Sequence, residues 1–286
     1  MRKCCLSPAL LTLARIFHTP IETPTVRRVR ARGLQPHLSA PVRRVPSRGV
    51  WGYEICRLAV VLVAASPLSA GLANQLTDEE KAAGWKLLFD GATTRGWHSF
   101  RKDTFPTKGW DVQDGWLHGL GRGGGDILSD GEFEQFELEW DWKQAPAGNS
   151  GLKYFVLDTR NAPLGHEYQM IDDAREADAS HAKRVTAAFY DVLAPATKPH
   201  TKTAGEINHS RILVQGNHVE HWLNGEKVLE YSCGSDEVKA AVANSKFKNV
   251  RGFGERAKGH LLLQEHGSEV WFRNLKIRDL SGQPSK

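Results

Sequence analysis

Alternating apolar and polar residues are the most regular feature of this chain. Between residues 136 and 142, aromatic and aliphatic side chains alternate with acidic ones, and this period of two predicts a long strand with one buried face. Asn224-Gly225 separates two short runs, 218–223 and 226–231, and this dipeptide is typical of a tight β-hairpin. The pattern predicts further strands at residues 152–157, 167–171, 211–215, 261–265 and 270–277.

Only two short segments carry helix signals. Thr77 and Glu80 have the spacing of a capping box, and Gly84 is placed to end the helix that they begin. Ser235 precedes two acidic residues and predicts a second helix that runs to about Ser245. Because strands and short loops account for the rest, and alternating strand–helix units are missing from the pattern, we expect an antiparallel β-sandwich with two minor helices.

The positive charge of the chain belongs to its N-terminal part. The 286 residues carry a formal net charge of +5, but residues 1–57 hold 11 Lys and Arg against 2 acids. Residues 58–286 hold the remaining 27 Lys and Arg against 31 acids. The expected domain therefore has no net excess of cations to offer phosphates, and we expect no nucleic-acid partner.

The N-terminal part also resembles an export signal. Arg57 precedes an apolar run at 58–65, and small residues follow up to Ala73, after which we expect cleavage. Eight apolar residues are too few to span a bilayer, and no cysteine adjoins the expected cleavage site to carry a lipid anchor. We expect a leader at 1–73 and a periplasmic or secreted domain at 74–286. Because the signal begins about fifty residues into the chain, either its basic region is long or translation starts downstream, for example near Val50.

Several motifs are better explained by structure than by chemistry. The glycine-rich run 121–125 lacks the lysine and the long helix of a phosphate-binding loop. His218 and His221 lie three apart in a predicted strand and should face opposite sides, as surface or cross-strand residues rather than zinc ligands. The eight tryptophans from Trp85 onward are expected mainly in the core, although some can stack on sugar rings.

A series of short segments, taken together, resembles a known family. The segments are residues 84–91, 96–97, 110–115, Gly148-Asn149-Ser150-Gly151-Leu152, Glu167-Tyr168-Gln169, Tyr190 with 194–195, 205–208, 222–225, Leu263-Gln264-Glu265-His266-Gly267 and 272–275. Each is common alone, but their order over about residues 76–280 is similar to that of the 3-keto-disaccharide hydrolase family. The resemblance implies a concanavalin A-like jelly-roll sandwich, commonly exported, that acts on oxidised glycosides.

Strand alternation indicates which polar residues share a face. In residues 152–156 the even-numbered side chains suit the core, which leaves Lys153 and Phe155 on the opposite face. Glu167 and Gln169 share a face of the next strand, and Gln264 and His266 share a face of another. These polar residues are therefore expected to converge on the concave face of one sheet.

The chemistry implied by the resemblance assigns provisional roles to these side chains. A 3-keto group acidifies the proton on C2, so that a base can remove it and the glycosidic oxygen can leave C1; water then adds back. Glu167 and His266 are the acid and base candidates. A divalent metal is a possible cofactor without a decisive ligand set. The candidates for binding or positioning the sugar are Lys153, Gln264, Asn149, Gln169, Tyr190 and Asp172.

Two other functions remain open at this point. Glu167, Gln169 and Asp172 have the spacing of laminarinase-type catalytic strands, although Gln169 stands where a carboxylate is expected and a bulge would be needed to align Asp172. The non-enzymatic alternative is a carbohydrate-binding module, which predicts a groove lined by tryptophan with no perturbed carboxylate.

Overall fold

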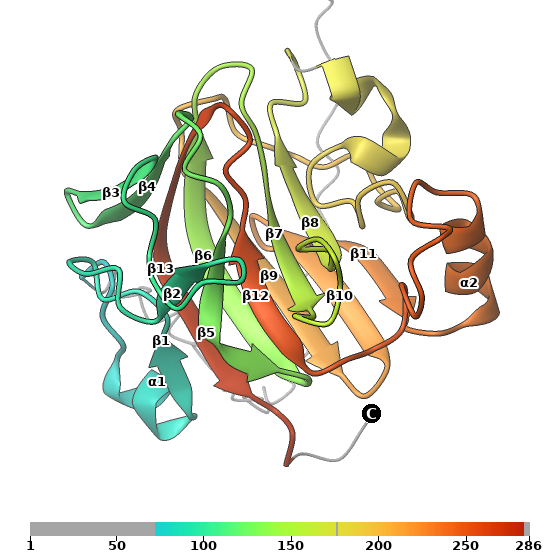
Figure 1. Ribbon diagram of the computed structural model, residues 1–286, viewed down its shortest axis with the longest axis horizontal. Helices are drawn as coiled ribbons and strands as arrows, with labels where there is room; N and C mark the ends of the chain where they lie inside the picture. Colours follow the sequence, from blue (N-terminus) through green and yellow to red (C-terminus); the bar gives the residue numbers. More distant parts are fainter. Residues whose placement is uncertain (1–71, 176, 283–286) are drawn as a thin grey trace, which may run out of the picture. The chain divides into compact units, whose positions relative to one another are not determined.

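The computed structural model describes residues 72–175 and 177–282 and shows two antiparallel β-sheets (Figure 1). The predicted leader, including its apolar run at 58–65, lies outside the described residues up to residue 71. The predicted jelly-roll β-sandwich is confirmed. No helix in the described residues has the length and apolar character needed to cross a membrane.

The larger sheet has eight strands. Seven follow the order β11-β10-β9-β6-β13-β4-β3, and β1 pairs with one part of β13. The predicted hairpin is confirmed, because β10 and β11 pair on either side of Asn224-Gly225. The strands are β1 (Trp85–Leu87), β3 (Trp110–Gln113), β4 (Trp116–Leu120), β6 (Phe136–Gln144), β9 (Asn208–Gln215), β10 (His218–Leu223), β11 (Glu226–Ser232) and β13 (Glu269–Asp279).

The smaller sheet has five strands in the order β2-β5-β12-β7-β8. Its inner face and that of β6 contribute side chains to one apolar core. The alternation predicted for β6 is confirmed, since Phe136, Leu138, Trp140 and Trp142 are all fully buried. The strands are β2 (Trp97–Ser99), β5 (Ile127–Phe133), β7 (Asn149–Val156), β8 (His166–Ile171) and β12 (Gly259–Leu263).

The two predicted helices are present and their N-terminal caps are confirmed. In α1 (Asp78–Ala82) the Glu80 backbone N–H donates to the Thr77 hydroxyl, and the Thr77 N–H donates to the Glu80 carboxylate. Ser235 caps α2 (Asp236–Ala243), which ends two residues before the predicted limit. The sequence pattern did not reveal two short 3₁₀ helices, η1 (Ala177–Ser180) and η2 (Ala182–Arg184).

The predicted orientation of Phe155 is wrong. Two residues of β7, Tyr154 and Phe155, oppose the single residue Leu261 of β12, and Phe155 has a left-handed backbone with φ 58°. This bulge turns the Phe155 ring into the main core and moves Val156 to the other face, where it packs with Leu262. Lys153 therefore keeps its predicted outward face while Phe155 does not.

Of the two positions predicted for His221, surface or cross-strand, the surface position is wrong. His221 is fully buried, its Nδ1 donates to the Ala187 carbonyl oxygen, and its Nε2 lies 2.8 Å from the Tyr154 hydroxyl. His218 points to the opposite face and is partly exposed, as its spacing predicted. The sequence pattern misses His221 because a buried histidine is tolerated when polar partners reach it from other strands.

Candidate functional site

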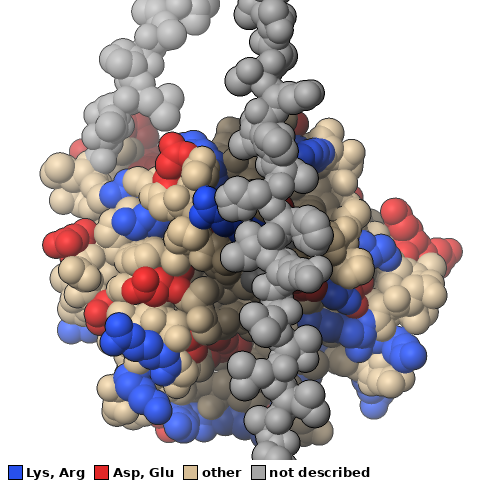
Figure 2. Space-filling view, turned by 90° about the horizontal axis from the view of Figure 1, so that it is seen from above, with Lys and Arg blue, Asp and Glu red and all other residues tan. Residues whose placement is uncertain are grey.

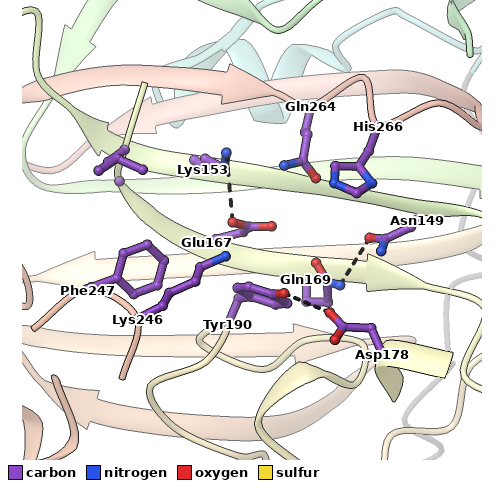
Figure 3. A pocket seen from close by; sticks show the side chains of 12 residues that line it. Asn149, Lys153, Glu167, Gln169, Asp178, Tyr190, Lys246, Phe247, Gln264 and His266 are labelled. Carbon is purple, nitrogen blue, oxygen red and sulfur yellow. Dashed lines mark hydrogen bonds and ion pairs between the residues drawn. The ribbon is translucent and has the colours of Figure 1, made fainter. Parts of the chain in front are cut away.

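A pocket of about 450 Å³ opens on the face of the five-stranded sheet that points away from the core (Figure 3). Strands β7 and β8 supply its centre, and the segments around η1 and after α2 supply one side. Seven of the eight predicted site residues line it. The lining residues are Asn149, Lys153, Leu164, Gly165, Glu167, Gln169, Asp178, Tyr190, Lys246, Phe247, Gln264 and His266.

Glu167 lies at the centre of this pocket, directly across from Lys153 in the ladder between β8 and β7. The residue is only 5% exposed, and burial raises the pKa of its carboxyl against the opposing pull of Lys153 and Lys246. A Cβ on Gly151 would lie 2.7 Å from Glu167 Oε1, so the glycine of the Asn-Ser-Gly motif leaves the space that this carboxyl fills. Its raised pKa and its position in a pocket make Glu167 the foremost acid–base candidate.

Lys153 lies between two carboxyl groups. Its Nζ is 3.9 Å from Glu167 Oε2 and 3.8 Å from Asp126 Oδ2, and its side chain is 9% exposed. Burial also raises the pKa of Asp126. At these distances the ammonium forms ion pairs with both carboxyls but no direct hydrogen bond.

The glycine-rich run near Asp126 braces this arrangement. The Glu265 carboxylate accepts from the backbone N–H groups of Gly123 and Gly125 at 3.5 and 3.3 Å. The Glu265 N–H in turn donates to Asp126 Oδ1 at 3.1 Å. The run therefore has a structural role, as expected, and it fixes the position of Asp126, which the sequence analysis did not identify.

Two further charged residues in the pocket were missed by the sequence analysis. Asp178 accepts from the Tyr190 hydroxyl and from Arg184, both at 2.7 Å, and although burial opposes it these bonds hold the pKa of Asp178 below its usual value. The Lys246 ammonium lies 4.1 Å from the centroid of the Tyr190 ring and points toward Glu167 in Figure 3. Burial lowers the pKa of Lys246.

The amide side chains lie beside these charges. Gln169 Nε2 donates to Asn149 Oδ1 at 3.2 Å. Rotating the Gln169 amide by 180° lets the same nitrogen donate to Glu167 Oε1 at 3.2 Å and to the Ser150 carbonyl oxygen at 3.0 Å. Gln264 and His266 enter from the opposite side, after the end of β12 (Figure 3).

Asp172 is the one predicted site residue that does not line this pocket. It follows the end of β8, where its Oδ2 accepts from the Ala147 N–H at 2.9 Å and its Oδ1 from the Ala174 N–H at 3.2 Å. A carboxylate used in this way holds two loops together. The alignment of Glu167 with Asp172 that a laminarinase-type strand needs is therefore missing from this part of the chain.

The described residues bring three metal-binding side chains within 4.8 Å of one another only at His218, Glu220 and Glu230. This cluster lies on β10 and β11 rather than in the pocket, and Lys227 donates to both of its carboxylates. In the pocket, the Lys153 ammonium itself takes the position between Asp126 and Glu167. The donor set therefore does not fit a divalent metal.

The pocket also differs from the groove of a carbohydrate-binding module. Its lining residues include Tyr190 and Phe247 but none of the tryptophans in the described residues. Glu167, by contrast, is a carboxyl with a raised pKa. On the visible part of the surface in Figure 2, basic and acidic side chains are interspersed.

Comparison with known proteins places these features in a family. Residues 84–278 match the family model described as the 3-keto-alpha-glucoside-1,2-lyase-like domain. A 3-keto-disaccharide hydrolase from Bacteroides thetaiotaomicron is 33% identical over 232 residues, which cover 70% of this chain and 79% of that protein.

Two solved structures from Parabacteroides distasonis, both provisionally named glycosyl hydrolases, are also similar. One has a TM-score of 0.67 and 37% identity, and the match covers 73% of this chain and all of that one. The other has a TM-score of 0.56 and 30% identity over 68% of this chain and 99% of that one.

Proposed function

Because this chain belongs to the 3-keto-alpha-glucoside-1,2-lyase-like family, we propose that it cleaves the glycosidic bond of 3-keto-glycosides, disaccharides included, by elimination followed by hydration. One observation carries the proposal: Glu167 is a buried carboxyl with a raised pKa that lies in a polar pocket between two lysines. A base whose pKa is raised toward the operating pH is suited to removing a carbon-bound proton.

The first step is removal of the C2 proton by the Glu167 carboxylate. The electron pair of the C2–H bond moves toward the neighbouring ketone, and negative charge develops on the C3 oxygen. Lys153 and Lys246 flank Glu167, and their ammonium groups supply positive charge for this oxygen, as an oxyanion site requires. Gln264, just after the end of β12, adds an amide donor.

The second step breaks the bond between C1 and the glycosidic oxygen. The enolate electron pair forms the C1–C2 double bond, and the leaving oxygen takes a proton, for which His266 at the pocket rim is the donor. Water then adds to C1 and C2 regains a proton, so that the net reaction is hydrolysis. Asn149, Gln169 and Tyr190 hold the ring hydroxyls during both steps.

A substrate pair tests this function directly. Purified protein should cleave a 3-keto-glucoside and leave the unoxidised parent intact, because only the ketone acidifies C2. Deuterium at C2 should slow cleavage if removal of this proton limits the rate. Cleavage of the parent at a similar rate would instead support a direct glycosidase, and binding without cleavage of either sugar would support a carbohydrate-binding module.

We also propose export. Arg57, the apolar run at 58–65 and the small residues before Asn74 support this proposal. Leu72 is 73% exposed, and the Asn74 N–H donates to Asn274 Oδ1 at 2.6 Å, so the residue expected to begin the mature protein is bound to β13. N-terminal sequencing of the native protein should start near Asn74. Recovery of an intact leader from the soluble protein would contradict export.

A further inference from the structure

A second pocket adjoins the first and has no role in the proposed mechanism. Its empty volume is about 1160 Å³, larger than that of the first pocket. The two pockets share Leu164 as a wall. The second pocket is lined by Leu157, Thr159, Arg160, Asn161, Ala162, Leu164, Asn249, Val250, Arg251 and Gly252.

The same two chain segments build both pockets. The connection between β7 and β8 gives residues 157–164 to the second pocket and 164–165 to the first. The segment after α2 gives Lys246 and Phe247 to the first pocket and 249–252 to the second. A disaccharide whose oxidised ring lies at Glu167 can therefore extend past Leu164, beyond the end of the site that Phe247 marks in Figure 3.

The charged residues that line the second pocket are all basic. Its lining residues include two arginines and two asparagines but no carboxylate. Within the described residues, neither Arg160 nor Arg251 has a carboxylate within 4.0 Å. Arg251 is exposed, whereas Arg160 is partly buried. An unpaired guanidinium that has lost part of its hydration is costly unless an anion reaches it.

Arg160 is held in place by backbone carbonyl oxygens, which, within the described residues, leave its Nη2 free to donate. Its Nη1 donates to the carbonyl oxygens of Phe155 and Leu164 at 3.2 and 2.7 Å, and its guanidinium lies 5.7 Å from the centroid of the Phe253 ring. Its Nε is buried and has no partner in the described part of the chain. Burial lowers the pKa of Arg160, as expected for a cation without a counter-ion.

We propose that the second pocket is the leaving-group subsite and that it selects a sugar carrying a carboxylate, a uronic acid. This inference rests on the proposed cleavage of 3-keto-glycosides, because that reaction defines the leaving group. Arg160 Nη2 and the exposed Arg251 guanidinium can each donate to a carboxylate oxygen, and the two asparagine amides are suited to the hydroxyls of the same sugar.

A matched pair of substrates isolates the carboxylate. One carries glucuronic acid as the leaving group of a 3-keto-glucoside, and the other carries the neutral, nearly isosteric glucuronamide. Wild-type kcat/KM should be about tenfold higher for the acid, the usual scale for one charge-assisted hydrogen bond. In Arg251→Gln and in Arg160→Gln this ratio should fall toward one.

The control for loss of a positive charge is Lys239→Gln, on the exposed face of α2, which should keep the tenfold ratio. A calorimetric comparison of the unoxidised acid and amide disaccharides repeats the test without chemistry. Tighter binding of the acid in wild type and its loss in Arg251→Gln support the subsite, even if no 3-keto substrate is cleaved and the proposed reaction fails. Equal binding and equal kcat/KM for acid and amide, or a preference that survives in both arginine variants, would overturn it.

Discussion

Strands β7 and β8 present two very different faces, and both contain buried polar groups. On the inner face, the Tyr154 hydroxyl lies 2.6 Å from that of Tyr231 and 2.8 Å from His221 Nε2, and His166 Nδ1 lies 2.8 Å from the Tyr231 hydroxyl. On the outer face, Lys153 stands 3.9 Å from Glu167. The inner groups are joined by hydrogen bonds, whereas the outer pair is an ammonium and a carboxyl whose closest atoms lie farther apart than a hydrogen bond.

The difference shows how one pair of strands combines stability with function. Buried neutral groups joined by hydrogen bonds cost little and keep the core specific. Buried charges that the protein does not pair directly are costly, and they persist where a ligand makes use of them. The alternation of the strand separates the two kinds of group by a single residue, since Tyr154 follows Lys153 and Glu167 follows His166.

The inner face should make the fold sensitive to acid, and this is the largest effect that we expect. Burial lowers the pKa of His221 to about 4 and that of His166 well below its usual value. Since the unfolded chain takes up these protons near pH 6.5 and the folded one does not, stability should fall as the pH drops below about 6.5 and continue falling to about pH 4. For His221 alone the limit is about 3 kcal/mol.

Urea unfolding at a series of pH values between 8 and 4.5 measures this loss. His221→Gln should lower the slope of the unfolding free energy against pH, whatever it does to stability at pH 8. Glu167→Gln, on the outer face, serves as the control. Because burial raises the pKa of that carboxyl, its protonation increases stability as the pH falls, which is the opposite of the effect expected for His221. A slope that His221→Gln leaves unchanged would contradict the assignment.

The outer face should respond in turnover rather than in stability. Glu167→Gln keeps the shape of the side chain but removes the base, and it should lower kcat for a 3-keto-glycoside by about 10²-fold or more. The melting temperature should stay close to that of wild type. Glu132→Gln, an exposed carboxyl on β5 of the same sheet, is the matched control and should remain active. Full activity in Glu167→Gln would transfer the role of base to another residue, with Asp126 the next to test.

A smaller effect is expected when the Glu167 carboxyl is displaced rather than removed. The added Cβ in Gly151→Ala would meet Oε1 at 2.7 Å, so the carboxyl must shift, and we expect a loss of about tenfold in kcat. The double variant Gly151→Ala with Glu167→Gln provides the test. It should be no slower than Glu167→Gln alone, since the carboxylate is already absent; a further tenfold loss would mean that Gly151 acts elsewhere.

The strands and the outer-face residues could be predicted because both depend on a local period. Glu167 and Gln169 are two apart in one strand, and the ladder that places Lys153 across from Glu167 follows from the same pleat. Phe155 could not be placed, because a bulge changes the alternation at one residue and leaves no mark in the apolar pattern.

The missing part of the site comes from segments without any period. Asp178 lies in a 3₁₀ helix of four residues, and Lys246 follows the end of α2. Their positions in the pocket depend on tertiary contacts: Asp191 accepts from the Lys246 backbone N–H at 2.8 Å and from Arg184 Nε at 2.9 Å, and Arg184 in turn binds Asp178. No short motif encodes a chain of contacts that spans some seventy residues.

The smallest effect is expected for His218→Ala, which tests whether a polar cluster outside the pocket matters. His218 Nε2 lies 3.1 Å from Glu220 Oε1 on a partly exposed face, and Lys227 and Trp222 donate to the same carboxylate. Loss of one of several partners at such a site costs well under about 1 kcal/mol, so the melting temperature and kcat should both stay close to wild type.

The comparison uses steady-state turnover of a 3-keto-glycoside. His266→Ala, a variant from the pocket rim, is measured beside His218→Ala. If His218→Ala lowered turnover as much as His266→Ala does, the β10–β11 cluster would take part in the reaction. The reactive groups would then not be confined to the outer face of β7 and β8.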